Sequence, residues 1–317
     1  AAGHEQPASA RRLAKVVATI GPASDSPEMV RRLIDAGVSV FRFNFSHGTL
    51  EDHARRLAIV RAEAEKIGVP IACLGDLQGP KIRIGKIPAG VGAASPSGGG
   101  LISAEAGQDI ILCRSIKEAI VRMGRSGPEP VLPVTYPDLI DEVEIGHRVL
   151  INDGAVRMLA VEKNQAAGEL RCRVVSGGPI SSGKGINLPQ SNIAAPAITD
   201  RDWECTKWAV EHELDYLALS FVRSAADVEE LRAGLKRMGG EDRGWIPIVS
   251  KIEKPQAVDA IDSIVAASDA IMVARGDLGV EMDIAQVPVA QKQIMKVCAE
   301  HGKPCIVATQ MLETMIE

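Results

Sequence analysis

The chain has 317 residues, of which 46% are hydrophobic and 24% are charged, and its net charge is −5. These proportions are typical of globular proteins and exclude a mainly disordered chain. No apolar run approaches the roughly 18 residues of a membrane span, and the acidic balance with 3% aromatic residues argues against a general nucleic-acid or anionic-membrane binder. The length fits two domains, or one α/β barrel of roughly 250 residues with an insertion.

The cysteines and the first residues predict a reducing compartment. The six cysteines form no C-x-x-C pair, so their spacing fits neither a zinc ribbon nor a dense set of disulfides. Cys73 and Cys305 lie inside apolar runs, where a free thiol packs as a small hydrophobic group. Residues 1–14 lack the apolar core of a signal peptide and are predicted to form a flexible tail. Together these features predict a cytoplasmic protein with reduced thiols.

The first third of the chain alternates strand and helix patterns, which is typical of parallel βα units. Ser26 followed by Pro27 predicts the start of a helix, and Gly37 predicts its end. Thr49 and Asp52 have the spacing of a helix-capping pair, which begins a second helix to about residue 67. The strands are predicted at 15–20, 38–45 and 71–76.

This pattern stops at Gly79 and Pro80. From there to residue 188 the chain is rich in glycine and proline and holds short strand-like pieces, so we expect a small β domain inserted after the third strand. Capping pairs resume at Thr199 and Ser224, and further helices are predicted near 255–267 and 284–300. The later strands are predicted at 216–221, 248–253, 270–274 and 304–309.

The predicted fold class is therefore α/β: a TIM-type (β/α)₈ barrel that is incomplete at its carboxyl end, with seven strands instead of eight. The predicted domains are the tail at 1–14, a barrel domain formed by 15–79 and 189–317, and the inserted β domain at 80–188. In such a barrel, polar side chains at the carboxyl ends of the strands build the active site.

Two strand ends carry charged side chains on one face. Arg42 and Asn44 alternate with three phenylalanines, so we expect both of them to point to the barrel mouth. Lys251 and Glu253 are likewise two residues apart at the end of a strand. Asp277 follows the next strand and is expected in a loop near Glu253, where the two carboxylates would suit Mg²⁺ or Mn²⁺.

A cation site beside a lysine and an arginine suits the positioning of a phosphoryl group. Gly276 and Gly279 leave backbone N–H groups open to an anion. Other interpretations stay open for single residues: Lys251 and Glu253 on a solvated sheet face, Arg42 in an inter-strand ion pair, and His47 as a loop or capping residue. Spacing alone therefore predicts only phosphate or carboxylate chemistry with a divalent cation.

Six motifs, taken together, resemble the pyruvate kinase family and occur in the family's order. They are Ala18–Ser24, Arg42–Gly48, Lys184–Pro189, Ser250–Glu253, Met272–Gly279 and Ala308–Glu313. The resemblance implies a phosphotransferase of glycolysis that acts on phosphoenolpyruvate and ADP and forms pyruvate and ATP. It also implies that the inserted domain is a lid that excludes water.

The resemblance assigns roles to single positions. It implies that Lys251, Arg42 and Thr309 are catalytic and that Glu253 and Asp277 hold Mg²⁺ or Mn²⁺. Substrate contacts are implied for Gly276, Asp277, Thr309 and Lys251. Contacts to the nucleotide and its phosphates are implied for Arg42, Asn44, His47, Arg83, Asp153 and Lys184.

Many members of this family bind K⁺ through oxygens at the positions of Asn44, Ser46, Asp76 and the residue that follows Asp76. That residue is Leu77 here, which offers no side-chain oxygen. Lys81 stands where K⁺-dependent members carry a glutamate. We therefore expect activity without added K⁺, with the ammonium of Lys81 supplying the positive charge.

The family continues with an eighth strand and a carboxyl-terminal domain beyond the last motif. From this difference the chain is expected to be a fragment, a chain completed by another chain, or a shortened relative. The full-length family implies a homo-oligomer, and neither nucleic acid nor a membrane is expected as a partner. Two other functions stay open: a Mg²⁺-dependent aldolase or lyase acting on a pyruvate enolate, and a non-catalytic ligand-binding relative.

Overall fold

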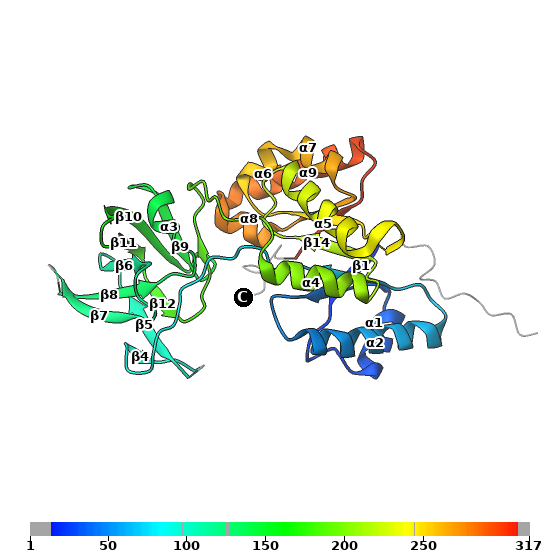
Figure 1. The fold of residues 1–317 in the computed structure, drawn as a ribbon, viewed down its shortest axis with the longest axis horizontal. Coiled ribbons are helices and arrows are strands. Elements are labelled where there is room, and N and C mark those ends of the chain that lie inside the picture. The colour runs from blue at the N-terminus through cyan, green and yellow to red at the C-terminus, as the bar shows by residue number, and fades with distance from the viewer. Residues whose placement is uncertain (1–13, 97, 125–126, 244, 310–317) are drawn as a thin grey trace, which may run out of the picture.

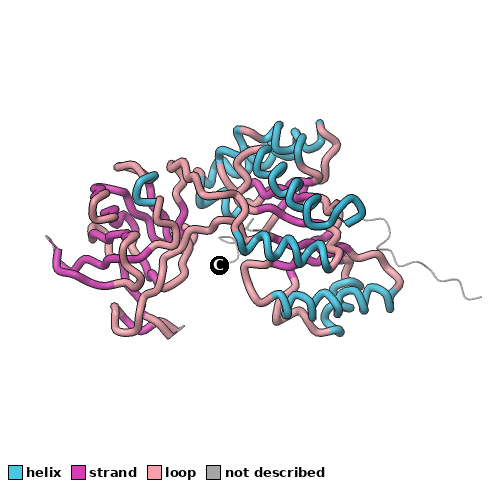
Figure 2. The backbone as a smooth tube through the Cα atoms, in the orientation of Figure 1, coloured by secondary structure: helices cyan, strands magenta, loops and turns pink. Residues whose placement is uncertain are grey.

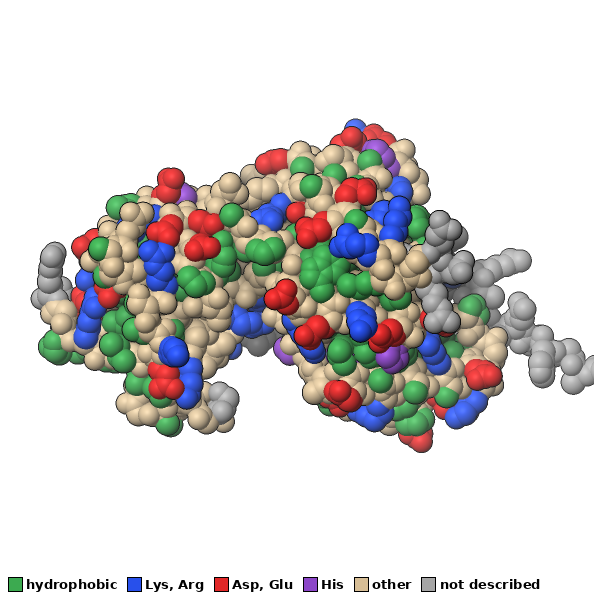
Figure 3. Space-filling view, in the orientation of Figure 1, with side chains coloured by type: hydrophobic (Ala, Val, Ile, Leu, Met, Phe, Trp, Pro, Cys, Tyr) green, Lys and Arg blue, Asp and Glu red, His purple; other side chains and the backbone are tan. Residues whose placement is uncertain are grey.

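The computed structural model describes residues 14–96, 98–124, 127–243 and 245–309. Most of the predicted tail, and the last motif from Gln310 onward, therefore lie outside the described residues. The described chain forms two lobes, one built mainly of helices around a parallel sheet and one built mainly of strands (Figures 1 and 2). A narrow waist joins the two lobes (Figure 3).

The larger lobe, here called the barrel lobe, contains a seven-stranded sheet in which every neighbouring pair of strands is parallel. The predicted α/β class with seven parallel strands is confirmed. The strands follow one another in the sheet in chain order: β1 (Val16–Thr19), β2 (Val38–Asn44), β3 (Ala72–Asp76), β14 (Tyr216–Leu219), β15 (Ile248–Ile252), β16 (Ala270–Val273) and β17 (Cys305–Val307). Parallel pairing places the carboxyl ends of all these strands at one edge.

Helices connect these strands and cover the sheet (Figure 1). Thr49 with Asp52 and Thr199 with Asp202 form reciprocal capping boxes, as their spacing predicts. The helices are α1 (Pro27–Asp35), α2 (Leu50–Ile67), α4 (Asp200–Glu211), α5 (Ala225–Arg243), α6 (Pro255–Asp259), α7 (Ile261–Ala267), α8 (Arg275–Glu281) and α9 (Val287–Glu300), with a 3₁₀ turn at Ile284–Gln286.

Three details differ from the sequence prediction. The segment 255–267 is two helices, because Ala260 leaves the helical conformation between them. Gly240 has a φ of 66° and kinks α5. The loop expected around Asp277 is the helix α8, so this carboxylate lies in the first turn of a helix. Two glycines in seven residues make this segment a poor helix former, but Leu278, which is fully buried, fixes the short helix against the core.

Alternating side chains divide the barrel lobe into two apolar layers. Phe41, Phe43 and Phe45 are buried between the sheet and the helices, in the large core of this lobe. Leu74 and Met272 belong to a separate small core on the opposite face of the sheet. The strict alternation of a strand therefore directs Arg42 away from the helix layer, as expected.

The smaller lobe, here called the β lobe, has its own apolar core. It contains a sheet of the order β13-β9-β10-β11-β6-β8-β7 and a three-stranded sheet of the order β12-β5-β4. Its elements are β4 (Ala93–Ala94), β5 (Gly100–Ala104), β6 (Asp109–Cys113), β7 (Ile120–Gly124), β8 (Gly127–Pro133), α3 (Leu139–Glu142), β9 (Arg148–Ile151), β10 (Val156–Asn164), β11 (Glu169–Ser176), β12 (Gly178–Ser181) and β13 (Ile186–Asn187). The predicted domain boundaries at 79/80 and 188/189 stay a prediction.

The two chain segments that connect the lobes lie side by side. The N–H of Ile186 donates to the carbonyl of Ile82 at 2.8 Å, and the N–H of Ile84 donates to the carbonyl of Lys184 at 2.8 Å. Beside them, the Asn187 amide donates to Glu281 of α8 at 2.9 Å. The two connecting segments are therefore hydrogen-bonded to each other, and the contact between Asn187 and Glu281 holds them against the barrel lobe. No helix in the described part of the chain is long and apolar enough to cross a lipid bilayer.

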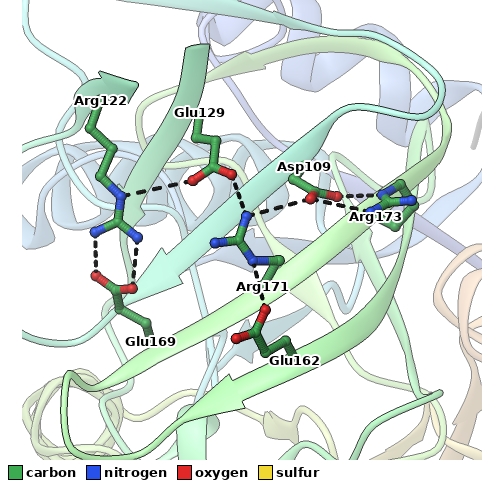
Figure 4. Close-up of polar contacts among 7 residues, drawn as sticks. All are labelled: Asp109, Arg122, Glu129, Glu162, Glu169, Arg171 and Arg173. Carbon is green, nitrogen blue, oxygen red and sulfur yellow. Dashed lines mark hydrogen bonds and ion pairs between the residues drawn. The ribbon is translucent and has the colours of Figure 1, made fainter. Parts of the chain in front are cut away.

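A chain of ion pairs crosses the β lobe (Figure 4). Arg171 of β11 is its centre and contacts Glu129, Asp109 at 3.4 Å and Glu162 at 3.2 Å. Beyond these, Arg122 forms a two-point pair with Glu169, with both distances 2.8 Å, and Arg173 pairs with Asp109. The side chain of Glu129 is only 6% exposed, so its charge depends on these arginines.

The position of each arginine predicts its contribution to stability. Arg171→Met should lower the free energy of unfolding by about 3 kcal/mol, because it leaves the carboxylate of Glu129 buried without its closest cation. Arg173→Met should cost at most about 1 kcal/mol, since the Arg173 side chain is 50% exposed. Urea unfolding of both variants measures the difference. Equal losses would contradict the central role of Arg171.

Candidate active site

A polar cleft of about 540 Å³ lies between the carboxyl ends of the barrel-lobe strands and the β lobe. Its lining brings together side chains from both lobes that are far apart in the sequence. The sequence-predicted site residues among them are Arg42, Asn44, Ser46, His47, Asp76, Leu77, Lys81, Arg83, Asp153, Lys184, Lys251, Glu253 and Asp277. The cleft therefore collects five Lys or Arg side chains and four carboxylates.

Lys251 is the centre of the barrel-lobe side of the cleft. Its ammonium lies 2.8 Å from Glu253 and 3.3 Å from Asp76, and it donates a hydrogen bond to Ser220 at 2.8 Å. Ser220 in turn donates to the carbonyl of Leu77 at 2.6 Å. All of the charged partners are nearly buried, so each depends on the others for its solvation.

The backbone at Phe221 holds Glu253 from the other side. The Phe221 N–H donates to the second oxygen of Glu253 at 2.7 Å. Phe221 has a φ of 55°, which an L-residue with a large side chain rarely adopts. Such strain persists where the surroundings fix it, and here it aims one N–H at a carboxylate in the cleft.

Burial and charge act on both members of the central pair. Burial disfavours the ammonium of Lys251, but Glu253 and Asp76 outweigh it and hold the pKa of this lysine above its usual value. Burial raises the pKa of Glu253, and the charge of Asp277 adds to this, against the opposing effect of Lys251. A cation placed beside Glu253 and Asp277 would favour the ionised form of Glu253.

The described residues contain no group of three or more His, Cys, Asp or Glu side chains that could hold a metal ion alone. Glu253 and Asp277 both line the cleft and are close enough for their charges to interact. Two carboxylates with open positions for water and substrate oxygens are typical of Mg²⁺ rather than of a closed protein cage. The donor set therefore fits Mg²⁺ or Mn²⁺ bound together with an oxygen-rich ligand.

Arg42 is oriented by two contacts from neighbouring strands. Its Nε donates to Asp76 at 2.6 Å, and its Nη1 donates to the hydroxyl of Thr19 at 2.8 Å. Its side chain remains 25% exposed, so a face of the guanidinium group is open to the cleft. Arg42 can therefore form the inter-strand ion pair with Asp76 and still bind an anion in the cleft.

The residues of the predicted monovalent site lie together in the cleft. Asp76, however, is already paired with Arg42 and Lys251, and Leu77 is 1% exposed. Lys81 forms its ion pair with Asp153 of the β lobe at 3.7 Å. Its stem lies against Gly185, where a Cβ would come within 2.7 Å of the lysine Cε. A side chain at Gly185 would thus push Lys81 out of this position.

The β lobe contributes the opposite wall of the cleft. Arg83 donates to the carbonyl of Gly183 at 2.9 Å, and Lys184 lies in the same wall. Asn152 and Asp153 have φ values of 55° and 53°, so two successive non-glycine residues are left-handed there. This turn presents Asp153, whose side chain is 68% exposed, to the cleft.

Three predicted residues need separate comment. His47 lines the cleft, while its carbonyl is 2.9 Å from Nε2 of His53, so the loop around it is anchored to α2. Thr309 is exposed and Gly276 lies in α8, and neither is among the described residues that line the cleft. The carbonyl next to Thr309, that of Ala308, accepts a hydrogen bond from Arg275.

Sequence reasoning missed Ser220, Phe221 and Asn152. Ser220 follows the apolar run of β14, and this was a usable signal because it has the strand-end position of Glu253 and Asn44. Asn152 opens the run Asn152-Asp153-Gly154, which is typical of a turn with left-handed residues, whereas no comparable signal marks Phe221.

The fold and the cleft define a class: a (β/α) barrel-type protein whose polar cleft at the strand ends suits anions and a divalent cation. The model of the pyruvate kinase barrel domain matches residues 11–317, so the chain belongs to the pyruvate kinase family.

Similar proteins support the same family. A pyruvate kinase of Mycobacterium intracellulare is 40% identical over 306 residues, covering 96% of this chain and 60% of that protein. One from Thermococcus litoralis is 42% identical over 301 residues, covering 95% of this chain and 58% of that protein. The crystal structure of a pyruvate kinase from Cryptosporidium parvum has a TM-score of 0.83 and 35% identity, covering 95% of this chain and 58% of its own. The chain thus spans about 60% of the length of these relatives.

The charge cluster predicts a pH-dependent loss of stability. Lys251→Met should lower the free energy of unfolding by about 3–5 kcal/mol at pH 7, because Asp76 and Glu253 lose a shared buried cation. Burial already raises the pKa of Glu253, and losing the charge of Lys251 would raise it further. The loss is therefore full above this raised pKa and disappears as the pH falls below about 4, where Glu253 is protonated in both the folded and the unfolded state.

Urea unfolding between neutral and acidic pH measures this loss. The control is Lys207→Met, whose side chain is 69% exposed and whose loss should be small at every pH. A Lys251→Met penalty that does not change with pH would show that the lost lysine stem, rather than the unpaired carboxylates, causes it.

Proposed function

We propose that the protein to which this chain belongs is a pyruvate kinase. It moves the phosphoryl group of phosphoenolpyruvate to a terminal phosphate oxygen of ADP, with Mg²⁺ or Mn²⁺ as the metal. The enolate left behind takes up a proton at its methylene carbon and becomes pyruvate. The observation that carries the proposal is the buried Lys251, placed between Asp76 and Glu253 in a cleft that Asp277 and two arginines also line.

Lys251 has the main role toward the phosphoryl group. Its raised pKa keeps it protonated through the neutral range, so it can stabilise charge on the oxygens of a phosphoryl group in transfer. Ser220, Asp76 and Glu253 hold it in position before substrate arrives. Arg42 supplies a second cation at a fixed place, because Asp76 and Thr19 orient it.

Glu253 and Asp277 would hold the metal ion, which when bound shields the negative charges of the substrate phosphates. Phe221 fixes one oxygen of Glu253 through its N–H and leaves the other toward Lys251. The substrate contacts assigned to Gly276 and Thr309 by family resemblance remain part of the proposal. So does the catalytic role of Thr309.

The β lobe would act as the lid. Arg83, Lys184 and Asp153 form its wall of the cleft and are proposed to contact the nucleotide, with Asn44 and His47 on the barrel-lobe side. Closure of the β lobe would exclude water, so that the phosphoryl group passes to ADP rather than to water. The chain would bend at the two connecting segments, which are held together by the hydrogen bonds of Ile82 with Ile186 and of Ile84 with Lys184.

The metabolic setting follows from this activity. An enzyme that forms pyruvate and ATP from phosphoenolpyruvate and ADP acts in glycolysis. The proposed location of the protein is the cytoplasm. Homo-oligomers are proposed for the full-length protein, and no contact with nucleic acid or membranes is proposed.

Pyruvate formation from phosphoenolpyruvate, ADP and Mg²⁺ tests the proposed function. We expect turnover in the full-length protein, and Lys251→Arg should reduce it by about 100-fold or more, since a guanidinium group keeps the charge but not its position. Glu253→Gln should raise the Mg²⁺ concentration needed for half-maximal activity. Lys207→Met, on the exposed face of α4, is the control and should retain full activity.

Two results would contradict the proposal. One is pyruvate formation that is unchanged in Lys251→Arg. The other is release of pyruvate, without ADP, by cleavage of a carbon–carbon bond in a larger substrate, which would favour an aldolase. ADP binding without turnover in the full-length protein would instead favour a non-catalytic relative.

The monovalent-ion requirement is a separate test. We propose that the protein works without K⁺, because Leu77 offers no side-chain oxygen and Lys81 brings a positive charge to the same cleft. Rates in K⁺ and Na⁺ buffers of equal ionic strength should agree within about two-fold. Lys81→Glu should lower the rate in Na⁺ and restore part of it in K⁺. A large stimulation of the unmodified protein by K⁺ would contradict this proposal.

A further inference from the structure

Cys298 and Cys305 lie on the two sides of the turn that joins α9 to β17. Cys298 is in the last turn of α9, and Cys305 is the first residue of β17. Between them, Gly302 has a left-handed φ of 64°, and the N–H of Lys303 donates to the carbonyl of Cys298 at 2.8 Å. This bond reverses the chain directly over the end of the helix. The next residues therefore run back past Cys298.

The reversal brings the two side chains into contact. Cys298 is 1% exposed within the core between the helices and the sheet, and Cys305 packs against the same core while remaining partly open to solvent. The two sulfurs lie close enough for one thiol to interact with the other. Cys305 is held in place by the sheet, since β17 pairs with β16 in the register Ile271–Cys305. The pair is thus fixed from the helix side and from the strand side.

The contact changes the acidity of the pair. The interaction with the Cys305 thiol lowers the pKa of Cys298, since it stabilises the thiolate, and the second proton then becomes harder to remove from the pair. Cys73 and Cys205 behave differently, because burial raises the pKa of their thiols to about 12 and about 11. A reactive thiolate is therefore expected at the pair rather than at these two buried positions.

We propose that Cys298 and Cys305 are a redox modification site, at which a peroxide converts the two thiols into an intrachain disulfide. One sulfur, as the thiolate, attacks a peroxide oxygen and becomes a sulfenic acid, and the first water leaves. The other sulfur attacks the sulfenic sulfur, the S–S bond forms, and the second water leaves. In total, two thiols and one hydrogen peroxide give one disulfide and two waters. A thiol reductant such as dithiothreitol reverses the change.

The disulfide would act on the strand that leads to the cleft edge. Just beyond the end of β17, the N–H of Ala308 donates to the carbonyl of Val273 at 3.1 Å, and the carbonyl of Ala308 accepts from Arg275 of α8. A covalent link between α9 and the start of β17 would therefore tie the next helix after α8 to the strand whose end contacts Arg275. This consequence concerns the shape of the barrel lobe and holds whether or not the proposed phosphotransferase activity is correct.

Peptide mapping of the unmodified chain tests the proposal. The protein is treated with hydrogen peroxide, unfolded in the presence of iodoacetamide, and digested with a protease that cuts after glutamate. Cleavage after Glu300 separates the two cysteines, so only a disulfide can hold their peptides together. We expect the number of alkylated thiols to fall from six to four, and the joined peptides to be two hydrogens lighter than the two free peptides together.

Matched variants assign the lost thiols to this pair. Cys305→Val should keep all five remaining thiols alkylatable after peroxide, whereas Cys205→Ala should lose two of its five and still show the joined peptides. Six alkylated thiols after peroxide in the unmodified chain would overturn the proposal. Sulfinic acid at either cysteine, or joined peptides that come from two different chains, would overturn it as well. The measurement on the unmodified chain decides the question even if a variant fails to fold.

Discussion

The barrel lobe depends on the buried ammonium group of Lys251 being neutralised by nearby carboxylates. Lys251 lies within 3.3 Å of two carboxylates that are each 1% exposed, Asp76 and Glu253. A buried ion is costly unless it is paired and hydrogen-bonded, so β3, β14 and β15 must keep their relative positions for the cluster to persist. Their parallel register provides this, because it brings three strand ends to one edge of the sheet. The same arrangement leaves a charged, preorganised surface where the cleft begins.

Much of this arrangement could be predicted from strand periodicity. The alternation of phenylalanines with Arg42 and Asn44 indicated which face carries the site, and the burial of Phe41 and Phe43 agrees with it. The seven parallel strands were also predictable, since each one is a short run rich in apolar residues and helix-start signals follow several of them. Local patterns suffice here because each strand repeats the same βα unit.

The partners across strands were harder to predict. Family resemblance placed Asp76 at the position of a K⁺ ligand in other members, but it did not indicate that Asp76 lies between Arg42 and Lys251. Sequence periodicity gives the face of a side chain but not the neighbour it meets on another strand. The helix α8 was missed for a related reason, because two glycines in seven residues predict a loop unless a buried Leu278 anchors the segment.

The position of α8 also connects the β lobe to the proposed metal site. Asp277 lies in the first turn of this helix, and Glu281, its last residue, accepts a hydrogen bond from Asn187 at the base of the β lobe. Lys254, close to Glu253 in the chain, lies 3.6 Å from the same Glu281. Because a seven-residue helix moves as a rigid piece, rotation of the β lobe would act on Asp277 through Glu281. In this fold, closing the cleft and setting the distance between the two carboxylates proposed to hold the metal would thus be one movement rather than two.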